Sequence, residues 1–374
     1  MTSVRVVPAK LSGNIQLPPS KSQTMRALVF AALAKTPSKI HNPLPSPDTE
    51  CMVAALHALG AEITPDYHIV PHPLKMPAAP IYAGNSGLVY RLIRALMPVE
   101  ITGDDSIQTR RPIQPLIDGL SGLPHATIDG ADSQPVSALL IAMSKQNGTS
   151  TLRVQNPGET PFVQMTLSWF DKLGIPYTND NYEYYTVTGT TFSGFDYIVP
   201  SDWSSAAFPW ALGLKIEGTE DPDQGDAQLL KRDPLAGGAI DINDMIDTLP
   251  ILAALGSFAK TPTHITGAHI ARFKESDRIA AMTTELRKMG ARIDEQEDGM
   301  IIYPTPLHGA KLNSHGDHRV AMALIVAALN ATSQSIIYHV ECIAKSFPNY
   351  IQEMNRCSSY SALQVLEKTP LAVI

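Results

Sequence analysis

The sequence predicts an α/β protein of two domains assembled from one repeated structural unit. Its 374 residues are 44% hydrophobic and 17% charged, which is typical of a globular chain long enough to bury two cores. Three amphipathic segments each end in a glycine, and these glycines, Gly60, Gly174 and Gly290, lie 114 and 116 residues apart. So long a period indicates a repeated supersecondary unit.

Two kinds of helix are expected in this repeat. Six short, almost wholly apolar segments follow clusters of capping residues and predict buried helices. They are residues 20–34, 85–96, 132–143, 201–214, 244–259 and 315–329. Three amphipathic helices, residues 52–60, 165–174 and 282–290, show apolar i, i+3/i+4 spacing and have short strand-like runs on both sides.

Counted by buried helices, the period divides into six units of the type βαβαββ, three for each domain. The second and fourth units are short. Their amphipathic helices, expected at residues 111–120 and 226–232, lead almost directly into the next unit. We therefore expect the hairpin that follows the helix in the other units to be trimmed or missing there.

Composition excludes several functional classes. The net charge of −7 disfavours a general nucleic-acid surface, so any anion site must be a local basic cluster. Three scattered cysteines favour a reducing cytoplasm over a disulfide framework. The longest apolar run is far below the ~20 residues that cross a bilayer, and the N-terminus lacks a signal-peptide core. We expect a cytoplasmic protein with no membrane or nucleic-acid partner.

The stretch from Pro18 to Arg26 predicts an anion-binding helix start. Two prolines keep the chain extended, Ser20 or Ser22 can cap the helix, and an Ala/Leu-rich run continues it. Helix N-termini carry free N–H groups and a positive dipole end, and Lys21 and Arg26 add two formal charges. An ordinary capped helix with two solvated cations is the alternative for this stretch alone.

Further cations stand near the openings of other elements. Arg111 opens an amphipathic helix, Arg319 opens the sixth buried helix, and Lys345 lies just before a proline that ends regular structure. Lys274 and Arg278 are expected one turn apart on one helix face. Each alone is most often a solvated surface charge, but together they favour a site for ligands with several negative charges.

Two carboxylates are candidate acid–base groups. Asp247 lies within an apolar segment, where a carboxylate is costly unless it is paired or catalytic; a helix cap is the alternative. Glu275 lies between Lys274 and Arg278, where a plain helical ion pair is the alternative. His315 and His318 lack a third clustered ligand, so we expect no metal site, and no nucleotide-binding glycine motif is present.

Six motifs in order along nearly the whole chain give it a family resemblance. It resembles the 5-enolpyruvylshikimate-3-phosphate synthases through Leu17-Pro18-Pro19-Ser20-Lys21-Ser22…Arg26-Ala27, Gly84-Asn85-Ser86-Gly87…Arg91, Arg111-Pro112-Ile113, Lys274-Glu275-Ser276-Asp277-Arg278, Asp317-His318-Arg319-Val320-Ala321-Met322 and Ala344-Lys345-Ser346-Phe347-Pro348. The resemblance implies the two-domain enolpyruvyl transferase fold, with ligands between the domains. Residues 1–18 and 202–374 would form one domain and residues 19–201 the other.

The resemblance also implies the reaction. The enolpyruvyl group of phosphoenolpyruvate moves to the 5-hydroxyl of shikimate 3-phosphate and phosphate is released, a step of the shikimate pathway to chorismate and the aromatic amino acids. No metal or organic cofactor is implied, and we expect a monomer. Asp247 would take the hydroxyl proton, and Glu275 with Lys21 would protonate the methylene carbon and later reclaim a proton.

The implied binding residues form two sets. The phosphoenolpyruvate set is Lys21, Gly87, Arg111, Gln134, Arg278, Arg319 and Lys345. The shikimate 3-phosphate set is Lys21, Ser22, Arg26, Ser133, Gln134, Asp247 and Lys274. Addition and elimination would then depend on positioning and charge stabilisation rather than on a covalent enzyme intermediate.

Some positions depart from the family pattern. Asp132 and Glu159 stand where phosphate-binding serines are usual, Phe162 where tyrosine is common, and Ile270 where asparagine often touches substrate. Two carboxylates beside a phosphate would repel it, so the acceptor half of the site is the more altered.

Two other functions remain open. A non-catalytic or altered-acceptor paralogue is suggested by Asp132 and Glu159, although the candidate catalytic residues and clamp cations are retained. The sister transferase acting on UDP-N-acetylglucosamine carries a cysteine in the loop before the Arg-Pro motif. Residues 102–109 here have none.

Overall fold

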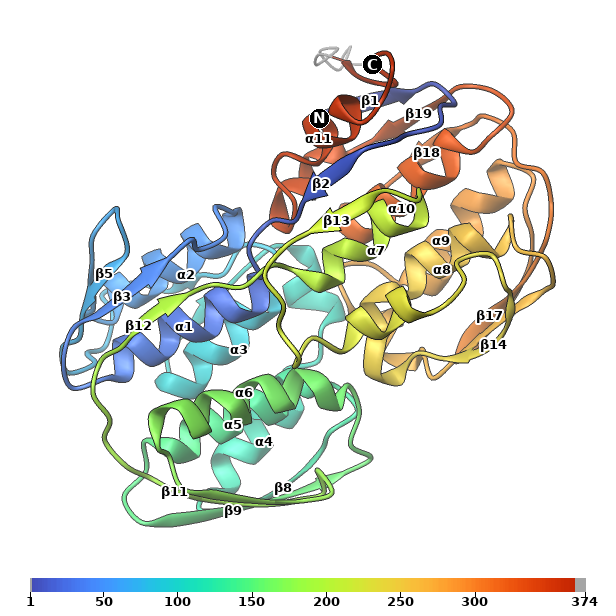
Figure 1. Cartoon of the computed structure of the whole chain (residues 1–374). Helices are drawn as coiled ribbons and strands as arrows, with labels where there is room; N and C mark the ends of the chain where they lie inside the picture. The colour runs from blue at the N-terminus through green and yellow to red at the C-terminus, as the bar shows by residue number, and fades with distance from the viewer. Residues whose placement is uncertain (1, 367–374) are drawn as a thin grey trace, which may run out of the picture. The chain divides into compact units, whose positions relative to one another are not determined.

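A computed structural model of the chain describes residues 2–366, which form two compact units (Figure 1). Unit 1 comprises residues 2–18, 202–219 and 226–366; unit 2 comprises residues 19–201 and 220–225. Residues 220–225, which we expected to lie with residues 202–374, are therefore part of unit 2. The side-chain amide of Gln23 donates to Asp221 Oδ2 at 2.8 Å and helps to hold this segment there.

Unit 2 contains two four-stranded sheets, β10-β11-β9-β8 and β12-β3-β5-β4, and the two-stranded sheet β6-β7. Its strands are β3 (Ser38–His41), β4 (Glu62–Ile63), β5 (His68–Val70), β6 (Ile81–Tyr82), β7 (Ile101–Thr102), β8 (His125–Asp129), β9 (Thr149–Gln155), β10 (Tyr177–Asp180), β11 (Tyr184–Thr188) and β12 (Asp196–Ile198). Its helices are α1 (Lys21–Leu33), α2 (Pro47–Ala58), α3 (Gly87–Leu96), the π-helical turn η1 (Ser106–Arg110), α4 (Gln114–Gly122), α5 (Ser133–Ser144) and α6 (Thr160–Leu173). Helices α1, α3 and α5 are the most deeply buried.

Unit 1 repeats this plan with sheets β18-β19-β1-β20, β14-β15-β17-β16 and β13-β2. Its strands are β1 (Ser3–Val6), β2 (Asn14–Gln16), β13 (Lys215–Glu217), β14 (Gly238–Asp241), β15 (Thr263–Thr266), β16 (Arg292–Gln296), β17 (Gly299–Tyr303), β18 (Lys311–Asn313), β19 (Ser335–Tyr338) and β20 (Leu363–Leu366). Its α-helices are α7 (Trp203–Ala211), α8 (Leu249–Gly256), α9 (Arg278–Lys288), α10 (His318–Leu329) and α11 (Tyr350–Arg356), and its 3-10 turns are η2 (Gly225–Lys231, of which residue 225 belongs to unit 2), η3 (Asn243–Thr248), η4 (His269–Phe273) and η5 (Val340–Lys345). Helices α7, α8 and α10 pack together at its centre.

The pairing pattern confirms the predicted repeat and its two trimmed copies. Within residues 2–366, each four-stranded sheet has one parallel and two antiparallel strand pairs. The two-stranded sheets β6-β7 and β13-β2 keep only a parallel pair. They belong to the second and fourth copies, where the hairpin that elsewhere adds two antiparallel strands is missing.

The caps explain where most of the buried helices begin. Ser20, Ser86, Asp132, Asp202 and Asp317 each occupy an N-cap, and the side chain of each accepts a hydrogen bond from a backbone N–H of the first turn. These bonds satisfy donors that a helix start otherwise leaves unpaired. Of the predicted anion-binding residues, Lys21, Gly87, Ser133 and Arg319 lie in the first turns of these capped helices, whereas Arg111, Lys274 and Lys345 do not.

Three predicted helices differ in the structure. Residues 244–259 do not form one helix: Met245 has non-helical torsions (φ −141°, ψ 45°), and α8 begins only at Leu249, because Pro250 suits the first turn of a helix. Residues 226–232 form a 3-10 turn rather than an amphipathic helix. Lys274 has extended torsions and lies outside α9, which Asp277 caps, so Lys274 and Arg278 do not share a helix face.

None of the helices within residues 2–366 combines the length and apolarity needed to cross a membrane.

Candidate functional site

The predicted site residues divide between the two units, and we refer to the two groups as the unit 1 cluster and the unit 2 cluster. The unit 1 cluster contains Asp247, Lys274, Glu275, Arg278, Arg319 and Lys345. The unit 2 cluster contains Lys21, Ser22, Arg26, Gly87, Arg111, Ser133 and Gln134.

Arg278 is the centre of the unit 1 cluster. Its side chain is 1% exposed, and its three guanidinium nitrogens bond three carboxylates: Nε to Asp317 Oδ2 at 2.8 Å, Nη1 to Asp247 Oδ1 at 2.6 Å and Nη2 to Glu275 Oε2 at 3.1 Å. Burial disfavours the charged guanidinium, but these carboxylates outweigh burial and raise the pKa of Arg278 well above its usual value. A single permanently charged residue thus fixes the directions of three acidic side chains.

Asp247 is held between two arginines. Its Oδ1 accepts from Arg278, and its Oδ2 lies 2.8 Å from Nη2 of Arg319. It does not cap α8, because the N-cap of that helix is Thr248. The kink at Met245 places Asp247 on an irregular turn rather than on a helix, with its side chain 19% exposed. An oriented carboxylate that solvent and substrate can reach is suited to accept a proton.

Glu275 bridges two cations. Its Oε1 lies 2.8 Å from Nζ of Lys345, and its Oε2 accepts from Arg278. The residue precedes the first turn of α9, so this pair is not an ion pair along a helix. Lys274, which precedes Glu275 in the sequence, is also buried. A cation on each side of a carboxylate stabilises its charged form after it has given up a proton.

In unit 2, Gly87 is the first residue of α3 and has side chains packed closely against it. A Cβ placed there would clash with Nη1 of Arg111 and would lie only 2.9 Å from both Nη1 of Arg91 and Oε1 of Gln134. Arg91 Nη1 in turn donates to Gln134 Oε1 at 3.0 Å. The absence of a side chain at Gly87 therefore lets two arginines and an amide gather at the N-terminus of α3.

Two of the departures from the family pattern, Asp132 and Glu159, lie together at the N-terminus of α5. Asp132 caps this helix and pairs with Nη2 of Arg91 at 3.1 Å. Glu159, which is buried and has left-handed torsions (φ 50°), accepts from both the amide and the hydroxyl of Ser133, at 3.0 and 2.8 Å. The Glu159 carboxylate thus already accepts the hydrogen bonds of Ser133. The family resemblance assigned Ser133 to the binding of a substrate phosphate.

Arg26 is buried and bonds within unit 2 through all three guanidinium nitrogens. Nε donates to Thr166 Oγ1 at 3.0 Å, Nη1 to the Ser22 carbonyl at 3.2 Å and Nη2 to the Phe162 carbonyl at 2.6 Å. Burial lowers the pKa of Arg26 to about 10, against the opposing effect of Asp221. Lys21 and Ser22, on the first turn of the same helix, are half-buried. Arg26 therefore joins α1 to α6, and its role as a phosphate ligand stays a prediction.

Sequence reasoning missed two residues that organise these clusters. Arg91 links Gln134, Asp132 and the Pro112 carbonyl in unit 2, and burial lowers its pKa despite Asp132. Asp317 caps α10 while it pairs with Arg278 in unit 1. Both residues belong to the family motifs. Arg91 lies four residues after Gly87 and Asp317 lies two residues before Arg319, and this spacing was the signal in the sequence that could have identified them.

We expected no metal site at His315 and His318. His315 Nε2 lies 2.8 Å from the buried carboxylate of Glu285. Among residues 2–366, no group of three His, Cys, Asp or Glu side chains is arranged to hold a metal ion.

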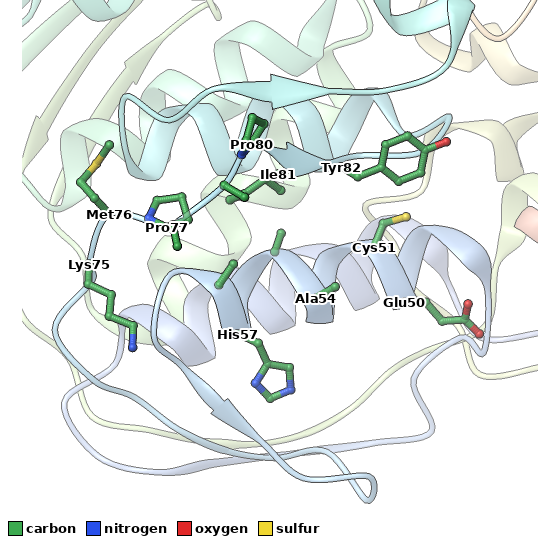
Figure 2. Close-up of a pocket in the computed structure, with 14 residues that line it drawn as sticks. Glu50, Cys51, Ala54, His57, Lys75, Met76, Pro77, Pro80, Ile81 and Tyr82 are labelled. Carbon is green, nitrogen blue, oxygen red and sulfur yellow. The ribbon is translucent and has the colours of Figure 1, made fainter.

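A separate cavity of about 920 Å³ lies in unit 2 between α2 and the segment leading into β6 (Figure 2). Its lining is mostly apolar, with Cys51, Met76 and Pro80 among its members. The charged groups of Glu50, His57 and Lys75 lie at separate points around it in Figure 2. It includes none of the predicted site residues, so it is not the expected anion site.

The fold and the two clusters define a class of protein. Six copies of one α/β unit carry buried helices. The cations, carboxylates and helix starts of these copies make sites suited to small polyanions. Solved structures share this architecture: an EPSP synthase from Acinetobacter baumannii has a TM-score of 0.79 at 23% identity, covering 98% of this chain and 100% of that one. The enolpyruvyl transferase NikO from Streptomyces tendae has a TM-score of 0.74 at 17% identity, covering 98% and 99%. The fold is that of the enolpyruvyl transferases.

Sequence comparison narrows this class. The profile of the family described as EPSP synthase (3-phosphoshikimate 1-carboxyvinyltransferase) matches residues 6–132, 125–220 and 211–354. The 3-phosphoshikimate 1-carboxyvinyltransferase of Chlamydia felis is 38% identical over 95% of this chain and 93% of its own length. That of Chlamydia caviae is 39% identical with the same coverage. The chain belongs to the EPSP synthase family.

Proposed function

We infer that this chain catalyses the transfer of the enolpyruvyl group of phosphoenolpyruvate to the 5-hydroxyl of shikimate 3-phosphate, with release of phosphate. Membership of the family supports this reaction, which serves the shikimate pathway of aromatic amino acid biosynthesis. The observation that carries it is Asp247, a partly exposed carboxylate oriented by Arg278 and Arg319. This is the arrangement that a base for a hydroxyl group requires.

We assign the proton transfers to the unit 1 carboxylates. Asp247 takes the proton of the attacking 5-hydroxyl as the oxygen bonds to the substituted carbon of phosphoenolpyruvate. Glu275 gives a proton to the methylene carbon, with Lys21 assigned to the same step, and takes one back when phosphate leaves. The pairing of Glu275 with Lys345 supports its role, because a neighbouring ammonium stabilises the carboxylate after it has lost its proton.

We assign the remaining residues to substrate binding. Arg111, Arg278, Arg319 and Lys345 would hold phosphoenolpyruvate, together with the backbone at Gly87 and the amide of Gln134. Ser22, Arg26, Ser133, Asp247 and Lys274 would contact shikimate 3-phosphate, and Lys21 and Gln134 would contact both substrates. The bonds from Ser133 to Glu159 indicate that the acceptor phosphate must compete with an internal carboxylate there.

A phosphate-release assay tests the reaction. Purified protein should release phosphate only when phosphoenolpyruvate and shikimate 3-phosphate are both present, and mass spectrometry should detect the enolpyruvyl ether product. Mixtures lacking one substrate serve as controls. Release no faster than in those mixtures, at millimolar concentrations of both substrates, would contradict the proposed function.

We propose that the protein works as a monomer in the cytoplasm. Its three cysteines, which all lie in the described part of the chain, form no disulfide, in keeping with a reducing compartment. Sedimentation velocity would test the monomer, and fractionation of cells would test the location.

A further inference from the structure

Asp226 is a buried carboxyl group that has no role in the proposed function. It lies in η2 and is fully buried. Among the described residues, no donor makes a hydrogen bond of normal geometry to either of its side-chain oxygens, although the Ser204 hydroxyl is close enough to influence the group. Burying an ionised carboxylate without full hydrogen bonding is costly, so the group favours its protonated form.

Two of the groups that act on Asp226, Asp247 and Arg319, belong to the proposed site. Asp247 on η3 repels its charge, Arg319 on α10 attracts it, and Asp202, the cap of α7, adds a further repulsion. Arg319 already binds Asp247 through Nη2 and the Ser204 carbonyl through Nη1, while its buried Nε has no hydrogen-bond partner among residues 2–366. Two carboxyl groups therefore share the field of one arginine.

We propose that Asp226 is a positioning residue whose protonation leaves the positive charge of Arg319 available to Asp247 and to the phosphoenolpyruvate anion. When Asp226 ionises, a second negative charge enters the buried cluster. This charge offsets the positive charge of Arg319. Anion binding then weakens, because the arginine must balance two internal carboxylates as well as the substrate. This inference rests on the proposed function for the identity of the anion only.

The protonation equilibrium of Asp226 falls in an accessible range. Burial is the largest cause, repulsion by Asp247 adds to it, and together they raise the pKa of Asp226 to about 7, against the attraction of Arg319. The state of Asp226 should therefore change between pH 6 and pH 8.

Steady-state kinetics of Asp226→Asn would test the proposal. Asparagine resembles the protonated acid in shape and cannot ionise, so the variant should keep the KM for phosphoenolpyruvate within about twofold of wild type at pH 6. At pH 8 the wild-type KM should exceed that of the variant by about fivefold or more, because only the wild type gains the charge. Comparing the two proteins at each pH removes the titration of the substrate itself.

Glu285→Gln is the matched control. Glu285 is also a buried unit 1 carboxylate, but its partners are Lys288, His315 and the Asn313 amide, outside the site. Its pH profile of KM should run parallel to that of wild type. If the ratio of KM values for wild type and Asp226→Asn does not change between pH 6 and pH 8, Asp226 is only structural and the proposal is overturned.

Unfolding measurements test the buried acid without substrate. A carboxyl whose pKa is higher in the folded than in the unfolded chain destabilises the fold as pH rises from about 4 to about 7. The unfolding midpoint of Asp226→Asn should therefore rise relative to wild type from pH 5 to pH 8, and Asp226→Ala offers the same test if Asn fails to fold. A constant difference would overturn the proposal. If the difference in unfolding midpoint grows with pH but the protein releases no phosphate, the proposed function is wrong instead.

Discussion

The two clusters treat their carboxylates differently. In unit 1 the acidic groups face cations: Arg278 binds Asp247, Glu275 and Asp317, and Arg319 and Lys345 add further pairs. In unit 2 the buried Glu159 uses the donors of Ser133 at a helix start. The first arrangement is compatible with the proton transfers proposed for Asp247 and Glu275, whereas the second places a carboxylate at a helix start that suits an anion. Chemistry and acceptor affinity should therefore be separable by mutation.

The largest effect should come from the unit 1 base. Asp247→Asn keeps the side-chain shape but cannot take the hydroxyl proton, so turnover should fall by a factor on the order of 10² or more with modest change in substrate binding. Phosphate release under saturating substrates measures turnover, and a binding titration measures affinity. Near-wild-type turnover would remove Asp247 from the mechanism and leave unit 1 without an assigned base.

The second-largest effect should come from a steric clash introduced at the start of α3. Gly87→Ala adds a Cβ that meets the Arg111 guanidinium and crowds Arg91 and Gln134. These side chains must shift, so the KM for phosphoenolpyruvate should rise on the order of tenfold while turnover changes less, since a 1 Å displacement of positioning groups is costly. Gly148→Ala, where no atom lies within 4 Å of the added Cβ, controls for a general loss of glycine although its φ is positive. Equal kinetics for both variants would contradict the crowding argument.

The substitution that most directly probes the unit 2 difference is Glu159→Ser. Removing the carboxylate frees the amide and hydroxyl of Ser133 and removes a negative charge. Shikimate 3-phosphate should bind tighter by about 1 kcal/mol or more if the carboxylate lies within about 6 Å of the phosphate. Calorimetric titration of wild type and variant would measure this. Equal or weaker binding would mean that Glu159 shapes the pocket instead of competing for it.

The smallest effect is expected for Asp132→Asn. Asparagine can still cap α5 through its side-chain oxygen, so only the charge of the pair with Arg91 is lost. Unfolding by urea should show a smaller loss for Asp132→Asn than for Asp132→Ala, because the alanine variant also removes the cap, which is worth about 1 kcal/mol. A loss as large in Asn as in Ala would show that the charge, not the cap, is what holds this turn.

Sequence predicted the repeat better than it predicted local backbone, and the roles of the site residues stay a prediction. Capping residues and apolar runs identified the buried helices, because both signals are local. The break before α8 was missed although Pro250, which lies inside the expected helix 244–259, was a local signal for it, because proline is favoured only in the first turn of a helix. The partners of Glu159 could not be predicted either. They join residues 26 positions apart through a left-handed torsion that the sequence does not display.

The pairing of the first strand has a consequence for synthesis on the ribosome. Strand β1 lies between β19 and β20, so residues 3–6 pair with segments made more than 300 residues later. Residues 19–201, by contrast, form almost all of unit 2 and emerge as one continuous stretch. Domains generally fold as they are completed, and contacts distant in sequence form slowly. Unit 2 should therefore fold while the chain is still growing, and the N-terminal strand must stay unpaired and unaggregated until translation is nearly finished.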